Sequence, residues 1–218
     1  MSDPATSAGT QKNDMERACD LMNGDMKKII DARIAEFRNL GRSDSYAIFN
    51  EMCFCILTAN YSALGGIRIQ KAIGDGFLTL PEAALAERLK SLGHRFPSAR
   101  AKYVVEARKN AGSLKSVLEK AGSGSEAREW FVRNVKGLGY KEASHFLRNV
   151  GFTDVAILDF HIIDILERCG AIQRPKTLTK NRYLEIERVL ADFAKKRGMN
   201  LAELDLYLWY METGKVLK

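Results

Sequence analysis

The chain has few residues that break regular secondary structure and few that cross-link small extracellular domains. Only 4 of its 218 residues are proline, so long regular elements are expected. The cysteines Cys19, Cys53, Cys55 and Cys169 show no metal-ligand spacing, which favours buried, reduced thiols. No apolar run approaches the ~18 residues of a membrane-spanning helix. These absences argue against a disulfide-stabilised scaffold, a zinc module and a membrane protein.

The composition is that of a globular protein with an excess of basic residues. Hydrophobic residues make up 46% and charged residues 28%, which excludes a disordered or collagen-like chain. Lys and Arg number 34 against 27 Asp and Glu, and the net charge of +7 favours an acidic partner such as nucleic acid. Residues 1–13 are polar and are expected to be a flexible tail rather than a secretory signal. After this tail we expect a single domain over residues 14–218, in a soluble cytoplasmic protein.

Helical periodicity dominates the rest of the chain. Apolar residues recur at helical spacing, and the only alternating stretch, 155–158, is too short to predict a strand. The expected helices are 15–40, about 44–59, 65–73, 81–92, 98–110, 114–121, a capped helix within 122–135, 141–150, 160–169, 180–197 and 201–213. The fold class is therefore predicted to be all-α, with about ten short helices packed in one or two lobes.

The most informative segment is a hairpin at about 125–150. Gly137 and Gly139 bracket Leu138 between the end of one helix and the start of the next. Glycines permit a tight turn, and the unpaired amides at a helix N-terminus suit a phosphate. The alternative is an ordinary corner between two helices. The charge near the hairpin favours the phosphate: the basic residues are Arg133, Lys136, Lys141 and Arg148, against the single acid Glu142.

Two side chains near this hairpin are candidates for chemistry. Lys141 is expected in the first turn of the helix that follows it, on the polar face with His145 and Arg148. A cation is unusual there because helix N-termini favour anions, and a lysine amine can serve as a nucleophile. Asp159 follows the apolar run 155–158. It is either the N-cap of the next helix or a carboxylate returned close to Lys141.

These segments resemble a known family. KGLGYKEASHFLRNVG followed by ILDFHI is similar to the helix-hairpin-helix DNA glycosylases, in which a Gly-x-Gly hairpin precedes a catalytic Lys and a catalytic Asp follows about 18 or 19 residues later. Lys141 and Asp159 are 18 apart. ILTANYSALGGIR, HRFPSAR and the final LYLWYMETGKVLK resemble the archaeal-type 8-oxoguanine DNA glycosylases/AP lyases. The cysteines of an endonuclease III-type iron–sulfur cluster are missing after Cys169.

The resemblance implies a fold and a reaction. The expected fold has two helical lobes with the active site in the cleft between them. The expected substrate is double-stranded DNA that contains 8-oxoguanine, flipped out of the duplex and excised. Lys141 would attack C1′, form a Schiff base and nick the strand by β-elimination. Asp159 would stabilise positive charge on the sugar, position Lys141 or relay its proton.

The resemblance also implies contacts with the DNA backbone. The amides of Gly137, Gly139 and Tyr140 would hold a phosphate, either directly or through a monovalent cation. His145 and Arg148 would touch the DNA from the same helix. We expect no cofactor and no protein-held metal, a monomer, and an archaeal or bacterial enzyme associated with the nucleoid.

Four further residues are implied at the flipped base, and each has an ordinary structural alternative. Asn60 would fill the gap in the duplex, or else end a helix. Phe96 and Trp209 would stack on the base, or else anchor a turn and fill a core. The carboxylate of Lys218 would accept a hydrogen bond from N7–H of 8-oxoguanine, which guanine lacks; the alternative is a frayed terminus.

Two other functions compete with this one. A non-catalytic hairpin module would grip DNA without chemistry, but such modules are shorter and require no Lys and Asp at this spacing. A helix-hairpin-helix glycosylase for another oxidised base, such as a pyrimidine, would keep the reaction and change the lesion. The missing cluster cysteines and the terminal Trp/Lys segment argue against a pyrimidine.

Overall fold

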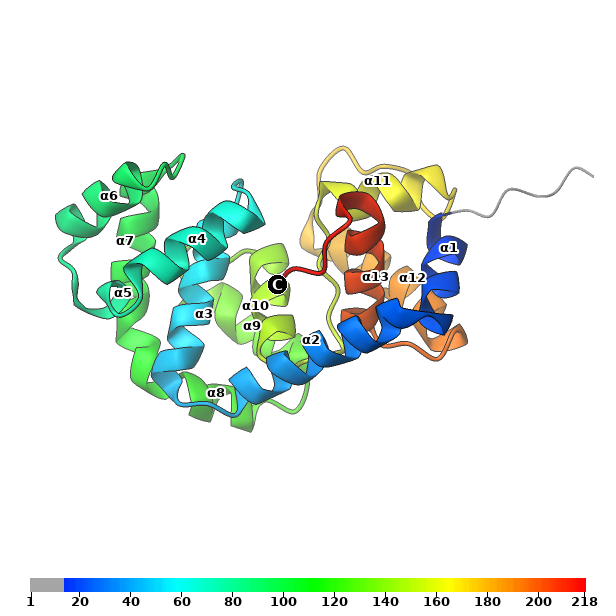
Figure 1. The fold of residues 1–218 in the computed structure, drawn as a ribbon, viewed down its shortest axis with the longest axis horizontal. Coiled ribbons are helices and arrows are strands. Elements are labelled where there is room, and N and C mark those ends of the chain that lie inside the picture. The colour runs from blue at the N-terminus through cyan, green and yellow to red at the C-terminus, as the bar shows by residue number, and fades with distance from the viewer. Residues whose placement is uncertain (1–13) are drawn as a thin grey trace, which may run out of the picture.

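The structure is a computed structural model that describes residues 14–218 (Figure 1), so the predicted tail 1–13 lies outside the described residues. Every regular element in this range is a helix, which confirms the all-α prediction. The helices are α1 (Asp14–Asp20), the 3-10 turn η1 (Leu21–Asn23), α2 (Asp25–Gly41), α3 (Ser45–Thr58), α4 (Ala63–Ile73), α5 (Gly76–Thr79), α6 (Glu82–Ser91), α7 (Pro97–Ala107), the 3-10 helix η2 (Arg108–Ser113), α8 (Leu114–Lys120), α9 (Gly124–Asn134), α10 (Tyr140–Asn149), α11 (Phe160–Arg168), α12 (Lys180–Lys196) and α13 (Leu201–Thr213). Along 14–218, no helix combines the length and the apolar character that crossing a bilayer requires.

Two hydrophobic cores divide the helices into two lobes. The first lobe consists of α3 to α10 and is centred on the nearly all-apolar helix α3, as its sequence predicts. The second lobe consists of α1, α11, α12 and α13, so it combines the first helix of the described residues with the last three. Helix α2 runs from the second lobe to the first and contacts both α13 and α10 (Figure 1). The predicted pair of lobes is therefore present.

Capping side chains set the start of several helices. Asp44 accepts hydrogen bonds from the amides of Tyr46 and Ala47 at the start of α3. Asn200 and Glu203 form a capping box at the start of α13. The predicted continuous helix over 15–40 was wrong, because η1 and Gly24 divide it into α1 and α2.

A buried ion pair joins the two lobes. The Arg128 guanidinium on α9 has no exposed surface and binds both carboxylate oxygens of Glu187 on α12, at 2.6 and 2.7 Å. A buried charge is tolerated when such a partner compensates its lost hydration. This pair fixes how the hairpin lies against the second lobe.

We expect Gly41→Ala to destabilise the fold. Gly41 ends α2 against the end of α10, and a Cβ there would lie 2.0 Å from the carbonyl oxygen of Val150. Backbone must shift to admit it, which costs about 1–3 kcal/mol of unfolding free energy. Gly112→Ala is the matched control, because a Cβ at Gly112 meets no atom within 4 Å. Urea unfolding of both variants checks this, and equal stabilities would contradict the close approach.

Candidate active site

A cleft of about 890 Å³ opens between the two lobes. The first lobe contributes residues of 58–64 and Arg95, and the second contributes residues of 157–161 and the end of α13. Helix α10 adds its polar face, and the chain end marked C in Figure 1 lies between the lobes. The side chains with functional groups in its lining are Thr58, Asn60, Tyr61, Ser62, Arg95, Lys141, Glu142, His145, Arg148, Asp159, His161, Asp205, Trp209, Thr213, Lys215 and Lys218.

Lys141 lies in the first turn of α10, as predicted. The neighbouring Glu142 turns back and accepts a hydrogen bond from the amide of Gly139 at 3.2 Å. Its other oxygen is 3.8 Å from the Lys141 amine. The Lys141 side chain keeps 27% of its surface exposed, so its amine is accessible from the cleft.

Asp159 caps a helix, as one of the two alternatives predicts, and it also lines the cleft. Its side chain accepts a hydrogen bond from the amide of Ile162 at 3.0 Å and so caps α11. The same residue lines the cleft with Lys141, which lies on α10. A carboxylate and an amine from different elements therefore face one solvent-accessible space, an arrangement suited to nucleophilic attack with stabilisation of a developing positive charge.

Asp205 is a functional group that sequence reasoning missed. It lines the cleft from α13 and forms an ion pair with Arg148 on α10. Burial raises the pKa of the Asp205 carboxyl, while Arg148 acts in the opposite direction and Asp159 adds to the rise. The available signal was an acid inside the nearly apolar run LDLYLWY.

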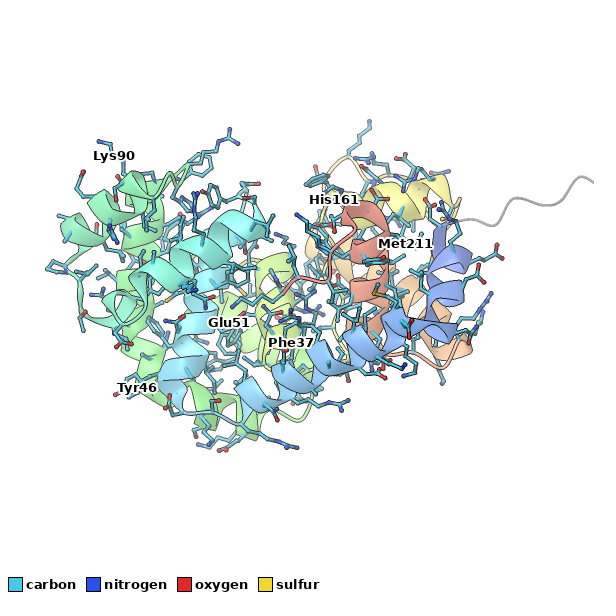
Figure 2. All side chains as sticks on the ribbon, viewed as in Figure 1. Phe37, Tyr46, Glu51, Lys90, His161 and Met211 are labelled. Carbon is cyan, nitrogen blue, oxygen red and sulfur yellow. The ribbon has the colours of Figure 1, made fainter. Side chains whose placement is uncertain are left out.

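The chain terminus is anchored in the first lobe rather than frayed. The Lys218 amine lies 2.6 Å from both Glu51 Oε2 and Gln70 Oε1, and 4.5 Å from the centre of the Phe54 ring. Glu51 is 2% exposed, and it also accepts a hydrogen bond from Asn149 at 2.7 Å. Figure 2 labels Glu51 on α3, near the end of the chain. This buried carboxylate was also missed, and an acid within NEMCFCIL was its signal.

His145 and Arg148 line the cleft but are themselves buried. The His145 ring packs edge-on against Phe54, with ring centres 5.6 Å apart. Burial lowers the pKa of this imidazole well below its ordinary value, and Arg148 and Lys141 lower it further. The Arg148 guanidinium donates hydrogen bonds to the carboxylate of Asp205 and to the side-chain oxygen of Asn149. Their predicted contacts with DNA stay a prediction.

The residues expected around the base divide into two groups. Trp209 lies in the cleft lining, with the ring of His161 edge-on at 5.3 Å; Figure 2 labels His161. Asn60 lies there too, with a φ of 57° that few non-glycine residues adopt. Phe96 does not line the cleft: it is 38% exposed beside Arg95, whose guanidinium is 5.0 Å from its ring centre.

The turn residues of the hairpin, Gly137, Gly139 and Tyr140, lie outside the cleft lining. Gly137 has a φ of 93°, and a Cβ there would come within 2.7 Å of the Tyr103 ring, so this position needs glycine. Gly139 has an ordinary φ of −84°. The Tyr140 ring packs against Tyr183 with ring centres 5.4 Å apart. The turn is therefore built as the Gly-x-Gly pattern predicts, next to the cleft rather than inside it.

Comparisons with known proteins agree with this geometry. The model of the family described as 8-oxoguanine DNA glycosylase matches residues 30–199. This chain belongs to that family. A protein of Methanocaldococcus jannaschii described as 8-oxoguanine DNA glycosylase/AP lyase is 54% identical over 200 residues, which cover 91% of this chain and 96% of that protein. A Korarchaeum cryptofilum protein of the same description is 51% identical over 207 residues, covering 94% and 97%.

Solved structures confirm the predicted helix-hairpin-helix glycosylase fold. The Methanocaldococcus jannaschii 8-oxoguanine glycosylase/lyase, crystallised with a 15mer DNA containing 8-oxoguanine, superimposes with a TM-score of 0.90 at 53% identity. The match covers 94% of this chain and 99% of that one. Endonuclease III in a non-covalent DNA complex superimposes with a TM-score of 0.55 at 14% identity and shares the fold alone.

Proposed function

We propose that this chain excises 8-oxoguanine from double-stranded DNA and then cleaves the abasic site, as a bifunctional DNA glycosylase and AP lyase. The observation that carries the proposal is that Lys141 and Asp159 line one solvent-accessible cleft between the lobes. Membership of the 8-oxoguanine DNA glycosylase family supports the choice of lesion. We expect a monomer, because one chain supplies the whole cleft, acting at the nucleoid in the cytoplasm of an archaeon or bacterium.

Lys141 is the nucleophile of this reaction. Its neutral amine attacks C1′ while the C1′–N9 bond breaks, and the departing base takes the bonding electrons and a proton. Opening of the sugar ring converts the adduct into a Schiff base. Loss of a C2′ proton then expels the 3′ phosphate by β-elimination, and water releases Lys141. The Asp159 carboxylate stabilises the positive charge that develops on the sugar as the base leaves.

The terminal carboxylate of Lys218 is the acceptor that distinguishes the lesion. 8-Oxoguanine carries a hydrogen on N7, and a buried acceptor left unpaired by guanine penalises the normal base. The anchoring of the Lys218 amine by Glu51 and Gln70 supports this role, because it fixes the position of the attached carboxylate. Trp209 forms a stacking wall for the base from within the cleft lining, whereas Phe96, the other predicted stacking residue, lies outside that lining.

The duplex is held outside this pocket. Gly137, Gly139 and Tyr140 receive a phosphate next to the cleft. Asn60 enters the gap left by the flipped base from the first lobe, and its position in the cleft lining, with a left-handed backbone, supports that role. His145 and Arg148 are expected to contact the DNA from α10.

Lys141→Gln is expected to abolish covalent trapping by borohydride on a duplex with a single 8-oxoguanine. Duplex binding should persist, because most of the affinity comes from phosphate contacts. Lys136→Gln is the matched control, since Lys136 is an exposed hairpin lysine with 58% of its side chain accessible. A Lys141→Gln enzyme that still cross-links would assign the nucleophile elsewhere. Trapping of wild-type enzyme on an oxidised pyrimidine, and not on 8-oxoguanine, would contradict the lesion.

Asp159→Asn is expected to separate capping from catalysis. Asparagine caps a helix about as well as aspartate, so the melting temperature should hardly change. Loss of the carboxylate charge should lower single-turnover excision by at least ~10²-fold. Asp44→Asn, at the cap of α3, calibrates the capping effect alone. Near-normal activity per folded molecule, together with a lower melting temperature, would leave Asp159 with only the capping role.

Deletion of Lys218, or a tag added after it, is expected to lower 8-oxoguanine excision strongly. Either change removes or displaces the terminal carboxylate and disturbs the contact with Glu51. Cleavage at a preformed abasic site should suffer less, since no base needs to be recognised there. The same tag placed before residue 1 is the control. Equal excision rates for the two tagged proteins would exclude the terminus from recognition.

A further inference from the structure

Residues 155–158, which lead into Asp159, form a buried, extended segment. Side chains of α12 form hydrogen bonds with the main-chain groups of this segment. Residues 155–158 are all less than 8% exposed, and their polar main-chain groups need partners. The Tyr183 hydroxyl donates to the carbonyl of Ala156 at 2.7 Å and accepts from the amide of Leu158 at 3.2 Å. Glu187 accepts from the amide of Ala156 at 2.7 Å. Two side chains one helical turn apart therefore fix the stretch that leads directly into Asp159.

The same two side chains are tied to the hairpin through Arg128. Its guanidinium forms the buried two-pronged contact with Glu187 and lies 5.4 Å from the centre of the Tyr183 ring. The guanidinium is also 5.2 Å from the centre of the Tyr140 ring, which packs against the Tyr183 ring, and Tyr140 directly precedes Lys141. The helix that carries Lys141 is therefore packed against the same charged group that holds Glu187.

Ser144 closes this connection on α10. Its hydroxyl is 3.1 Å from the Arg128 guanidinium and 3.3 Å from the Tyr183 hydroxyl. Ser144 lies three residues after Lys141, on the neighbouring turn of the same helix face. Burial raises the pKa of Tyr183 well above its ordinary value, so its hydroxyl keeps the proton that it donates.

We propose that Tyr183 and Glu187, held by Arg128, are positioning residues that set the placement of Asp159 relative to Lys141. They act through the backbone of 155–158 and not on the DNA, since neither is in the cleft lining. This inference rests on the proposed function of Lys141 and Asp159. Without this hydroxyl the buried carbonyl of Ala156 and amide of Leu158 would lose a partner, so we expect the stretch to shift, and a small misplacement of a reacting group has a large effect on the rate.

The test is Tyr183→Phe, which removes only the hydroxyl and keeps the ring against Arg128. Excess enzyme at saturating concentration is mixed with a duplex that carries 8-oxoguanine, and the single-turnover rate is measured well below the melting temperature of every variant. The rate is expected to fall about 10²-fold, as for a ~1 Å misplacement of a reacting group, while the Kd for the duplex changes less than about 3-fold. Tyr207→Phe is the matched control: Tyr207 is also 2% exposed in the second lobe, but lies near Lys27 and Asp31.

A double-mutant cycle with Asp159→Asn distinguishes positioning from general stability. If Tyr183 acts through Asp159, Tyr183→Phe should change the rate less than about 3-fold once Asp159 is asparagine. Equal fold-losses in both backgrounds, or a loss no greater than that of Tyr207→Phe, would overturn the proposal. Wild-type enzyme that does not cleave the substrate would instead reject the proposed function, so the two failures are distinguishable.

Discussion

The requirement that Glu51 be paired governs how the lobes and the chain terminus come together. This carboxylate sits on the most apolar helix of the molecule, and an ionised group in such surroundings needs a cation and hydrogen-bond donors. Lys218 supplies the cation from the far end of the chain, and Asn149 supplies a donor from α10. The terminal segment must therefore cross from α13 to the first lobe, and the cleft acquires a wall that the helices alone would not give it. Arg148 extends the same network from Asn149 to Asp205 in the second lobe.

Polar contacts and apolar contacts have separate tasks in this arrangement. Each lobe has its own apolar core, which accounts for most of its stability. Between the lobes lie two buried ion pairs, one centred on Arg128 and one on Arg148. Ion pairs of this kind contribute little net stability compared with apolar residues of similar size, but their geometry is specific and the loss of one partner is costly. They are suited to fixing the two lobes in one relative position, which a site shared between lobes requires.

Local features of this site could be predicted from the sequence, and long-range ones could not. The first-turn position of Lys141, the capping role of Asp159 and the turn at Gly137 each depend on residues within a few positions of one another. The contact between Lys218 and Glu51 joins residues 167 positions apart, and no periodicity encodes such a partner. The helix break at Gly24 was missed for a different reason: the apolar spacing continues across it, although Asn23-Gly24 is a local signal for a break.

The charged side chains of the cleft and those of the outer surface differ in how they are paired. Within the cleft, Arg148 is paired with Asp205 and the Lys218 amine with Glu51, so neither cation is free to attract a phosphate. The lining also contains Arg95, Lys141 and Lys215, and the chain as a whole carries a net charge of +7. At the hairpin beside the cleft, the Lys136 side chain is 58% exposed and the Arg133 side chain, which pairs with Glu129, is 74% exposed. Attraction to the DNA backbone is therefore expected from the exposed cations at the hairpin as well as from those of the lining, and salt can screen the exposed ones. Inside, paired charges hold donors and acceptors at fixed positions, and discrimination between bases depends on those positions rather than on net charge.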